Sequence, residues 1–278
     1  MKQVILITGA SSGIGKATAK YFAAHDWNVI ATMRSPQKET ELTQLSNVFV
    51  VKLDVQDPST IDAALKSGIN HFGHIDALIN NAGYGQAGVF ESVPPEQVVK
   101  QFDVNVFGVM NTIRAILPYF RQRGKGMILN ISSGAGQFTL PTLSLYNSSK
   151  YALEGFSEAL SYELSPLHIK VKIVEPGGTE TNFNATTANE ASGNLQLDDY
   201  KPFLASAGKL FEGMIAARLA TVEKVAEVIF TAVTDGKDTF RYVIGNEEFT
   251  ARMKARKEMS DQEYIDHMHE RITQNLPQ

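Results

Sequence analysis

Residues 4–15 read VILITGASSGIG, an apolar run of four residues followed by a turn that contains three glycines. The apolar run is typical of a buried strand, and the pattern after the turn is typical of a helix. Gly9 permits a tight turn, Gly13 lets the backbone approach a pyrophosphate, and Gly15 lets the helix pack closely on the strand. The helix N-terminus then offers free N–H groups to an anion. This stretch predicts a strand–turn–helix unit that binds a dinucleotide.

Two other interpretations of the same glycines stand beside this one. Gly9–Gly13 also matches G-x-S-x-G, the nucleophile elbow of hydrolases, and has the strand–turn–helix context that the elbow requires. That site needs an oxyanion loop from an earlier strand and later Asp and His partners, and neither stands out in the sequence. The glycines could also form a purely structural turn. We favour the dinucleotide site over both.

The overall composition excludes several classes of site. The 278 residues include 26 basic and 30 acidic side chains, a net charge of −4, which argues against a nucleic-acid partner. The chain has no cysteine, so disulfides and thiolate metal sites are excluded. The apolar run at residues 4–7 is too short for a signal peptide or a membrane span. We expect a cytoplasmic protein with no membrane span.

Short apolar runs alternate with longer helical patterns over the first two-thirds of the chain. This alternation predicts an α/β fold, a Rossmann-type doubly wound parallel sheet. The expected strands are Val4–Thr8, Asn28–Thr32, Val48–Leu53, Ala77–Asn80, Met127–Ile131, Lys170–Val174 and Arg241–Ile244. The expected helices are Ile14–His25, Ser59–Phe72, Glu96–Arg121, Tyr146–Leu164 and Thr221–Val233.

No linker, repeat or low-complexity block divides the chain, so we predict one domain over residues 1–245, followed by a C-terminal helical extension over residues 246–278. Residues 178–208 are rich in Asn, Thr, Ala and Ser and show little periodicity. A long irregular segment in a compact domain is often functional. We therefore expect residues 178–220 to form a substrate loop or lid.

The end of the second expected strand bears on the choice of nucleotide. An NAD site needs an acidic residue there for the ribose hydroxyls, and Thr32 and Met33 cannot take that role. Arg34 can instead pair with a 2′-phosphate through its charge and its fork of donors. We predict that NADP(H) is preferred and that NAD(H) remains possible. Arg34 as an ordinary solvated cation is the alternative.

Tyr146 and Lys150 are the candidate acid–base pair. They lie four residues apart in a helical pattern, which places them on adjacent turns of one face. A lysine ammonium beside a tyrosine favours the phenolate, so we expect the pKa of Tyr146 to be lowered. The spacing alone is equally compatible with a surface helix pair.

Polar motifs at other expected strand ends strengthen the pair. Ser132 and Ser133 follow one strand, Asn80–Gly83 follow another, and Asn105 lies in the segment after it. Ligands bind at the carboxyl ends of strands in open α/β sheets. With the Thr8–Gly15 turn, Asp54, Tyr146–Lys150 and Pro176–Gly177 in the same order, the chain resembles a single-domain short-chain dehydrogenase/reductase over residues 3–183.

The resemblance implies a role for each matching residue. Ser133 would hydrogen-bond the substrate oxygen, Tyr146 would exchange a proton with it, and Lys150 would tune Tyr146 and hold the nicotinamide ribose. Asn105 would position a water in a proton relay. The implied cofactor-binding residues are Gly9, Ser11, Ser12, Gly13, Ile14, Gly15, Arg34, Asp54, Asn81, Ala82, Gly83, Tyr146, Lys150, Pro176, Gly177, Thr179 and Thr181. Ser133 and Tyr146 would also bind the substrate, and no metal site is implied.

The resulting prediction is an NADP(H)-dependent oxidoreductase that interconverts a secondary alcohol and a ketone or aldehyde, with an apolar, steroid- or lipid-like substrate. Gln137, Phe138, Leu143, Phe183 and Tyr84 neighbour the catalytic motifs and are candidates to line its pocket. Relatives of this type lead us to expect a homodimer or homotetramer. A non-catalytic NAD(P)-sensing regulator of the same fold is the main alternative, and a nucleotide-sugar isomerase or dehydratase is a further one.

Overall fold

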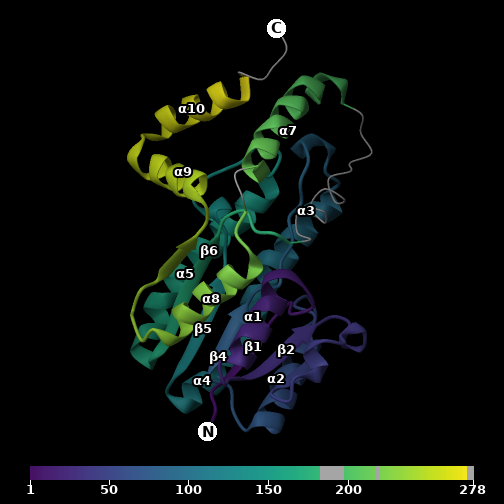
Figure 1. The fold of residues 1–278 in the computed structure, drawn as a ribbon, viewed down its shortest axis with the longest axis vertical. Helices are drawn as coiled ribbons and strands as arrows, with labels where there is room; N and C mark the ends of the chain where they lie inside the picture. Colours follow the sequence, from purple (N-terminus) through teal and green to yellow (C-terminus); the bar gives the residue numbers. More distant parts are fainter. Residues whose placement is uncertain (182–196, 217–218, 274–278) are drawn as a thin grey trace.

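Seven short strands pair in parallel in the order β3-β2-β1-β4-β5-β6-β7 (Figure 1). The computed structural model describes residues 1–181, 197–216 and 219–273. The strands are β1 (Val4–Ile7), β2 (Asn28–Met33), β3 (Val48–Lys52), β4 (Ala77–Asn80), β5 (Gly126–Ile131), β6 (Ile169–Pro176) and β7 (Arg241–Ile244). The predicted doubly wound sheet is confirmed, and every expected strand lies within a few residues of its predicted place.

Helices cover both faces of the sheet. They are α1 (Gly13–Ala24), α2 (Pro58–Phe72), α3 (Pro95–Phe102), α4 (Gly108–Arg123), α5 (Ser144–Leu164), α7 (Lys201–Ala216), α8 (Val222–Thr234), α9 (Glu247–Glu258) and α10 (Asp261–Thr273). Helices α1 and α8 pack on one face, and α2, α4 and α5 pack on the other (Figure 1).

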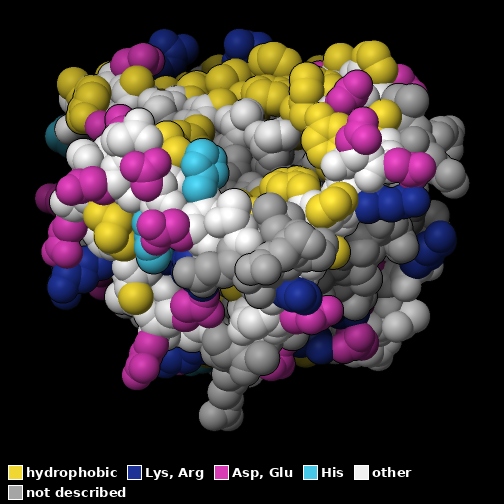
Figure 2. Space-filling view, turned by 90° about the horizontal axis from the view of Figure 1, so that it is seen from above, with side chains coloured by type: hydrophobic (Ala, Val, Ile, Leu, Met, Phe, Trp, Pro, Cys, Tyr) yellow, Lys and Arg dark blue, Asp and Glu magenta, His cyan; other side chains and the backbone are white. Residues whose placement is uncertain are grey.

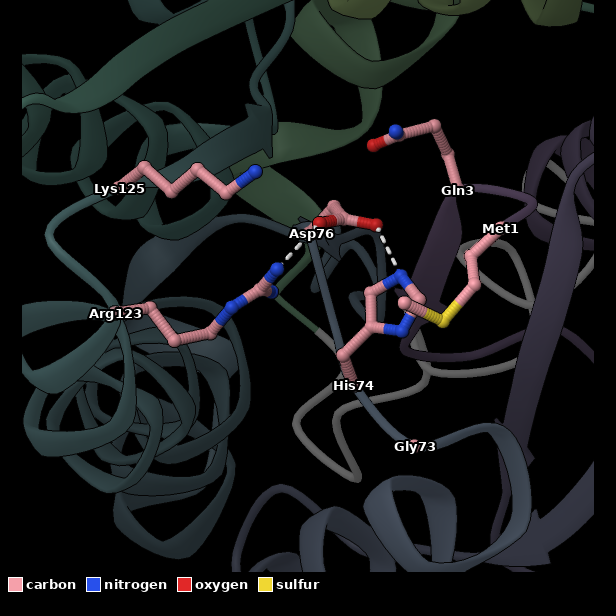
Figure 3. Close-up of a pocket in the computed structure, with 7 residues that line it drawn as sticks. All are labelled: Met1, Gln3, Gly73, His74, Asp76, Arg123 and Lys125. Atoms are coloured by element: carbon pink, nitrogen blue, oxygen red, sulfur yellow. Dashed lines mark hydrogen bonds and ion pairs between the residues drawn. The ribbon is translucent and has the colours of Figure 1, made fainter.

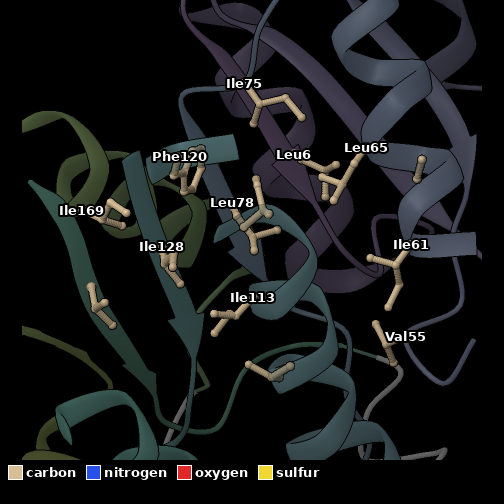
Figure 4. Packing of buried hydrophobic residues seen from close by; sticks show 14 of the residues in the cluster. Leu6, Val55, Ile61, Leu65, Ile75, Leu78, Ile113, Phe120, Ile128 and Ile169 are labelled. Atoms are coloured by element: carbon tan, nitrogen blue, oxygen red, sulfur yellow. The ribbon is translucent and has the colours of Figure 1, made fainter. Parts of the chain in front are cut away.

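The two hydrophobic cores follow from the alternation of side chains along each strand. Leu6 of β1 points into the core beneath α2, α4 and α5, whereas its neighbours Ile5 and Ile7 point into the core beneath α1 and α8. Figure 4 shows the first core, in which Ile61 of α2 and Ile113 of α4 reach toward the strands. Full burial of an aliphatic side chain contributes about 1.5–3 kcal/mol, so strands covered on both faces read as continuous apolar runs.

The strand order places a crevice beside β1. From β1 the chain moves outward to β2 and β3, and then returns to place β4 on the other side of β1. Such a reversal separates the loops that leave two neighbouring strands, and ligands bind there in open α/β sheets. The glycine turn after β1 and residues Asn81–Gly83 after β4 border this switch point.

One expected helix is interrupted in the structure. The single helix predicted over Glu96–Arg121 is α3, a π-helical turn at Asp103–Phe107, and α4. A Cβ added at Gly108 would lie 2.7 Å from a methyl carbon of Val55, so the backbone passes close to the segment after β3. Local widening of this kind often marks functional sites, and here it contains Asn105.

The prediction of an irregular segment after β6 was partly wrong. Residues 201–216 of it form α7, which contributes Leu210 to a small apolar cluster with Phe138, Phe249 and Met253. The apolar residues of α7 recur at helical spacing, but alanine, serine and glycine between them weaken the pattern in the sequence. Whether residues 178–220 act as a lid remains a prediction, and Phe183 lies outside the described residues.

A layer of helices lies above the carboxyl ends of the strands. Helices α7, α9 and α10 form it (Figure 1), and α7 packs against α10. Phe249 of α9 joins this layer to the sheet, because Cβ atoms added at Gly134, Gly177 and Gly245 would all lie within 3 Å of its ring or Cβ. No helix among the described residues is long and apolar enough to cross a membrane.

Candidate active site

The glycine turn closes tightly after β1. Gly9 and Gly13 have positive φ angles of 68° and 52°, which favour glycine. A Cβ at Gly9 would lie 2.8 Å from the Cα of Ala82, and a Cβ at Gly15 would lie 2.3 Å from the Gly9 carbonyl oxygen. The turn therefore has no room for a side chain at either position.

Asn81 holds this turn against the end of β4. Its side-chain amide donates to the carbonyl oxygens of Thr8 at 2.9 Å and Gly9 at 3.1 Å. The Thr8 hydroxyl in turn accepts hydrogen bonds from the backbone N–H groups of Asn81 and Ala82, both at 3.0 Å. These four bonds join the loops on the two sides of the switch point.

The N-terminus of α1 is suited to an anion. Its N-cap residue, Ser12, makes no side-chain capping bond, and the first turn contains no acidic residue. The first N–H groups of a helix lack partners within it, and its dipole favours negative charge there. Ser11 and Ser12 are exposed beside them, so this end can receive a pyrophosphate.

Arg34 and Asp54 lie farther along the same edge of the sheet. Arg34 follows β2, is exposed, and makes no ion pair with any residue in the described part of the chain. Asp54 follows β3 and accepts a hydrogen bond from the Gln56 N–H at 3.1 Å. Neither residue bonds to the other predicted site residues, so both remain available to a ligand that extends from the turn.

The π-helical turn points Asn105 into the site. Its side chain donates to the Tyr84 carbonyl at 2.8 Å and to the Ser149 hydroxyl at 3.2 Å, and its oxygen accepts from the Tyr84 N–H at 3.0 Å. A Cβ at Gly83 would lie 3.2 Å from the Asn105 side-chain oxygen. Asn105 thus connects the loop after β4 to α5.

Ser133, Tyr146 and Lys150 come together where α5 crosses the end of β5. The Ser133 and Tyr146 side chains are hydrogen-bonded, and the Lys150 Nζ lies 5.8 Å from the centre of the Tyr146 ring. Lys150 donates to the Ile131 carbonyl at 2.8 Å. Tyr146 is 8% exposed and Lys150 is 7% exposed, so both ionisable groups are almost removed from water.

Burial controls the ionisation of this pair. It raises the pKa of Tyr146 to about 12, and the hydrogen bond to Ser133 opposes that rise only in part. It also lowers the pKa of Lys150 to about 8, against the opposing influence of Glu154. The expected lowering of the Tyr146 pKa is therefore not found in the protein alone, because loss of solvation outweighs any effect of the lysine.

The segment after β6 closes the site from the other side. Ser133 donates to the Pro176 carbonyl at 3.5 Å, and the Thr179 hydroxyl donates to the Gly177 carbonyl at 3.0 Å. A Cβ at Gly13 would lie 3.3 Å from a methyl carbon of Thr181. The predicted residues from the glycine turn, the β4 loop, α5 and this segment therefore border one region.

A family model described as short chain dehydrogenase matches residues 3–192. The chain belongs to the short-chain dehydrogenase family. An uncharacterized oxidoreductase from Schizosaccharomyces pombe is 42% identical to it over 219 residues, 77% of this chain and 89% of the relative. The 3-ketodihydrosphingosine reductase of Bacteroides thetaiotaomicron is 39% identical over 211 residues, 76% of each chain.

Solved structures share most of the architecture of this short-chain dehydrogenase. A short-chain dehydrogenase from Streptomyces avermitilis has a TM-score of 0.80 and 32% identity, covering 96% of this chain and 98% of its own. ElxO with NADP bound has a TM-score of 0.72 and 28% identity, covering 88% and 96%. A 3-ketoacyl-(acyl-carrier-protein) reductase from Brucella melitensis, complexed with NADH, has a TM-score of 0.74 and 26% identity, covering 89% and 98%.

The short-chain dehydrogenase also has a pocket of about 280 Å³ at the opposite edge of the sheet (Figure 3). Asp76 is its centre: its carboxylate accepts from the Val4 N–H at 2.9 Å and pairs with His74 and Arg123, each at 3.0 Å. These contacts tie the starts of β1 and β4 to the end of α4. None of the predicted site residues lines this pocket.

Three polar residues behind Lys150 were missed in the sequence. Glu154 and Glu175 are buried, and Arg241 pairs with both of them. The only available signal was that Glu154 follows Lys150 by four residues on the same helix face. Glu175 and Arg241 lie on other elements, and their proximity depends on the fold.

The glycine turn yields a prediction about stability. We expect Gly15→Ala to lower the free energy of unfolding by about 1–3 kcal/mol, since its Cβ would overlap the Gly9 carbonyl and the Asn81 amide. The matched control is Gly155→Ala in α5, where an added Cβ meets nothing within 4 Å. That variant should gain about 0.5–1 kcal/mol in urea unfolding, as alanine is the better helix residue. Equal effects of the two substitutions would contradict the tight turn.

Proposed function

We propose that this short-chain dehydrogenase interconverts a secondary alcohol and a ketone or aldehyde with NADP(H), and that Tyr146 is the general acid and base. The observation that supports this most is the hydrogen bond between Ser133 and the buried Tyr146, with the buried Lys150 beside it. These groups lie at the carboxyl end of the sheet, next to a turn that is suited to a dinucleotide.

The residues present fit a dinucleotide. Gly9, Gly13 and Gly15 leave the turn open to a close backbone approach, and the uncapped end of α1 would hold the pyrophosphate. Asp54 and Ala82 would line the adenosine, and Thr179 and Thr181 the carboxamide. When bound, the nicotinamide donates or accepts the hydride. Two of the structural relatives are bound to NADP or NADH, which supports a cofactor of this class.

Each catalytic side chain has a distinct task in ketone reduction. Hydride addition builds negative charge on the carbonyl oxygen, and donors aimed at that oxygen stabilise the transition state. The Ser133 hydroxyl would donate a hydrogen bond to it, and the Tyr146 phenol would transfer its proton. Lys150 would hold the ribose and stabilise the phenolate that remains, and Asn105 would position a water for reprotonation through Lys150.

The high pKa of Tyr146 is consistent with the protonated acid that reduction requires. A pKa of about 12 keeps the phenol protonated at neutral pH. Alcohol oxidation needs the phenolate instead, and the extra positive charge of an oxidised nicotinamide beside Lys150 would favour it. On this account the site becomes an effective base only after the cofactor has bound.

An apolar substrate suits the layer above the site. Phe138, Leu210, Phe249 and Met253 form a buried apolar cluster beside the Ser133 loop, and Figure 2 shows hydrophobic side chains gathered over this end of the molecule. The similarity to a 3-ketodihydrosphingosine reductase supports a long-chain keto substrate. A purely NAD(P)-sensing role has no comparable support, because it would not need the buried tyrosine and lysine.

Replacement of the proton donor tests the proposal. Tyr146→Phe should lower kcat for NADPH-dependent ketone reduction by about 10²- to 10⁴-fold, with the Kd for NADPH nearly unchanged. NADPH absorbance would be followed with a panel of ketones that includes a long-chain 3-keto sphingoid base. Tyr151→Phe on the same helix, where the side chain is 40% exposed, is the control and should retain activity. Absence of turnover by the wild-type protein with every ketone would support the sensor instead.

The cofactor preference depends on Arg34. Arg34→Asp should lower the ratio of kcat/KM for NADPH to that for NADH by about 10- to 100-fold, because a charge-assisted hydrogen bond to the 2′-phosphate is lost. Lys66→Asp makes the same change of charge on an exposed position of α2 and should leave the ratio unchanged. If the wild-type protein uses NADH as well as NADPH, the assignment of NADP(H) is wrong.

A further inference from the structure

Two buried carboxylates lie behind Lys150. Glu154 extends from α5, one turn after Lys150, and is 5% exposed. Glu175 precedes Pro176 at the end of β6 and is fully buried. Buried carboxylates are expensive unless they are paired or protonated, so this pair requires a physical explanation.

A single guanidinium serves both carboxylates. The Arg241 Nε lies 3.1 Å from a Glu154 oxygen and 3.3 Å from a Glu175 oxygen, so the two carboxylates approach each other around it. Arg241 also pairs with a third carboxylate, since its Nη2 lies 2.6 Å from the exposed carboxylate of Glu158. One positive charge that is partly exposed therefore faces three acidic groups.

Each buried carboxylate also has one oxygen without a partner. Glu154 Oε1 and Glu175 Oε2 have no hydrogen-bond partner among the residues that the structure describes. The other Glu175 oxygen accepts from the Gln137 amide at 2.9 Å. An ionised carboxylate in such surroundings is under-solvated, and a proton on one of the two groups relieves both the burial and the repulsion.

The surroundings of Glu175 favour a proton on this carboxylate. Burial and the neighbouring Glu154 raise the pKa of Glu175 to about 7, while Arg241, Gln137 and Lys257 of α9 act in the opposite direction. At pH values below about 7, Glu175 is then mostly protonated. With one proton on the pair, one buried carboxylate charge remains to face Arg241 and Lys150.

Both carboxylates contact the loop after Ser133, and Glu154 also acts on Lys150. The negative charge of Glu154 raises the pKa of Lys150 against the effect of burial. Gly136, in the loop after Ser133, packs against Glu154, since a Cβ there would lie 2.9 Å from its Cγ. Gln137 joins the end of this loop to Glu175. The pair thus contacts the serine loop and influences the charge of the lysine.

We propose that Glu154 and Glu175 are positioning residues: Glu175 carries the proton of the buried pair, so that Glu154 keeps its charge, and that charge favours the cationic form of Lys150. The link to catalysis rests on the proposed function of Tyr146 and Lys150. The proton on Glu175 and the effect of Glu154 on the lysine can be measured without activity. Neither glutamate touches the reacting atoms on this account.

The pH dependence of stability tests the proton on Glu175. A carboxyl whose folded pKa is raised stabilises the fold fully below its ordinary value of 4.5, and that contribution is lost as the pH rises through about 7. In urea unfolding, wild type should lose stability relative to Glu175→Gln across this window. Glu158→Gln should differ from wild type by a constant amount, since interactions with Arg241 and Tyr162 lower the Glu158 pKa below this range. A flat difference between wild type and Glu175→Gln would overturn the proposal.

Direct titration of Lys150 tests the second half of the proposal. With ¹³C-labelled lysine, NMR should show Lys150 titrating near pH 8 in wild type and about 1 unit lower in Glu154→Gln, which lacks the neighbouring anion. Glu154→Asp keeps the charge and should restore the higher value, and Glu158→Gln should leave it unchanged. A Lys150 pKa that is the same in Glu154→Gln and wild type would overturn the proposal.

The kinetic consequence separates tuning from simple structural support. The alkaline decline of ketone reduction should move about 1 pH unit lower in Glu154→Gln, and less in Glu175→Gln, where Glu154 keeps its charge. A uniform fall in kcat at every pH, without a shift, would contradict the tuning role. If Tyr146→Phe remains active while the unfolding and NMR results hold, only the proposed function fails; if those results fail while Tyr146→Phe is inactive, only this inference does.

Discussion

The contact between Asn81 and the glycine turn is the constraint on which the site depends. The Asn81 amide holds the carbonyls of Thr8 and Gly9, and the absence of side chains at Gly9 and Gly15 lets the loops of β1 and β4 approach this closely. That approach opens the N-terminus of α1 toward the switch point. It also places Gly83 against Asn105, through which the β4 loop connects to α5. A change in this contact would therefore alter the cofactor side and the catalytic side together.

Burial is the second organising influence, and it acts on charge. Tyr146 and Lys150 lie in a site that disfavours the charged form of each, so the phenol stays protonated and the lysine is close to losing its proton. A tyrosine with a pKa of about 12 stays protonated at neutral pH but is a weak acid by itself, so in the proposed mechanism its proton transfer depends on charge brought to the site. Glu154, Glu175 and Arg241 form a cluster of ionisable groups next to Tyr146 and Lys150. A bound cofactor would add its own charge to the site. On this proposal, the ionisation of Tyr146 and Lys150 depends on two sets of charges, those of the buried cluster and those of the cofactor.

Much of this could be predicted from the sequence because the information is local. Short runs of four to six residues identified the strands, and polar residues after β1, β4, β5 and β6 had to meet because parallel strands end at one edge. Features that depend on contacts between distant segments escaped prediction. The π-helical turn at Asn105 accompanies the packing of Gly108 on Val55. The small residues of α7 weaken its helical pattern in the sequence. The direction of the Tyr146 pKa shift reflects burial that no local pattern reveals, and Glu154 meets Arg241 across 87 positions of sequence.

In the proposed mechanism, Tyr146 is a protonated acid whose ionisation is controlled by charge brought to the site. Tyrosine labelled with ¹³C at the ring carbon that bears the hydroxyl would report this directly, with Tyr146→Phe assigning the signal. Without cofactor, Tyr146 should show no titration up to pH 10, the ordinary tyrosine value, because burial raises its pKa to about 12. With NADP⁺ bound, the same signal should titrate about two or more units lower than it does in the free protein. A Tyr146 signal that titrates normally in the free protein, or that does not respond to NADP⁺, would contradict the account.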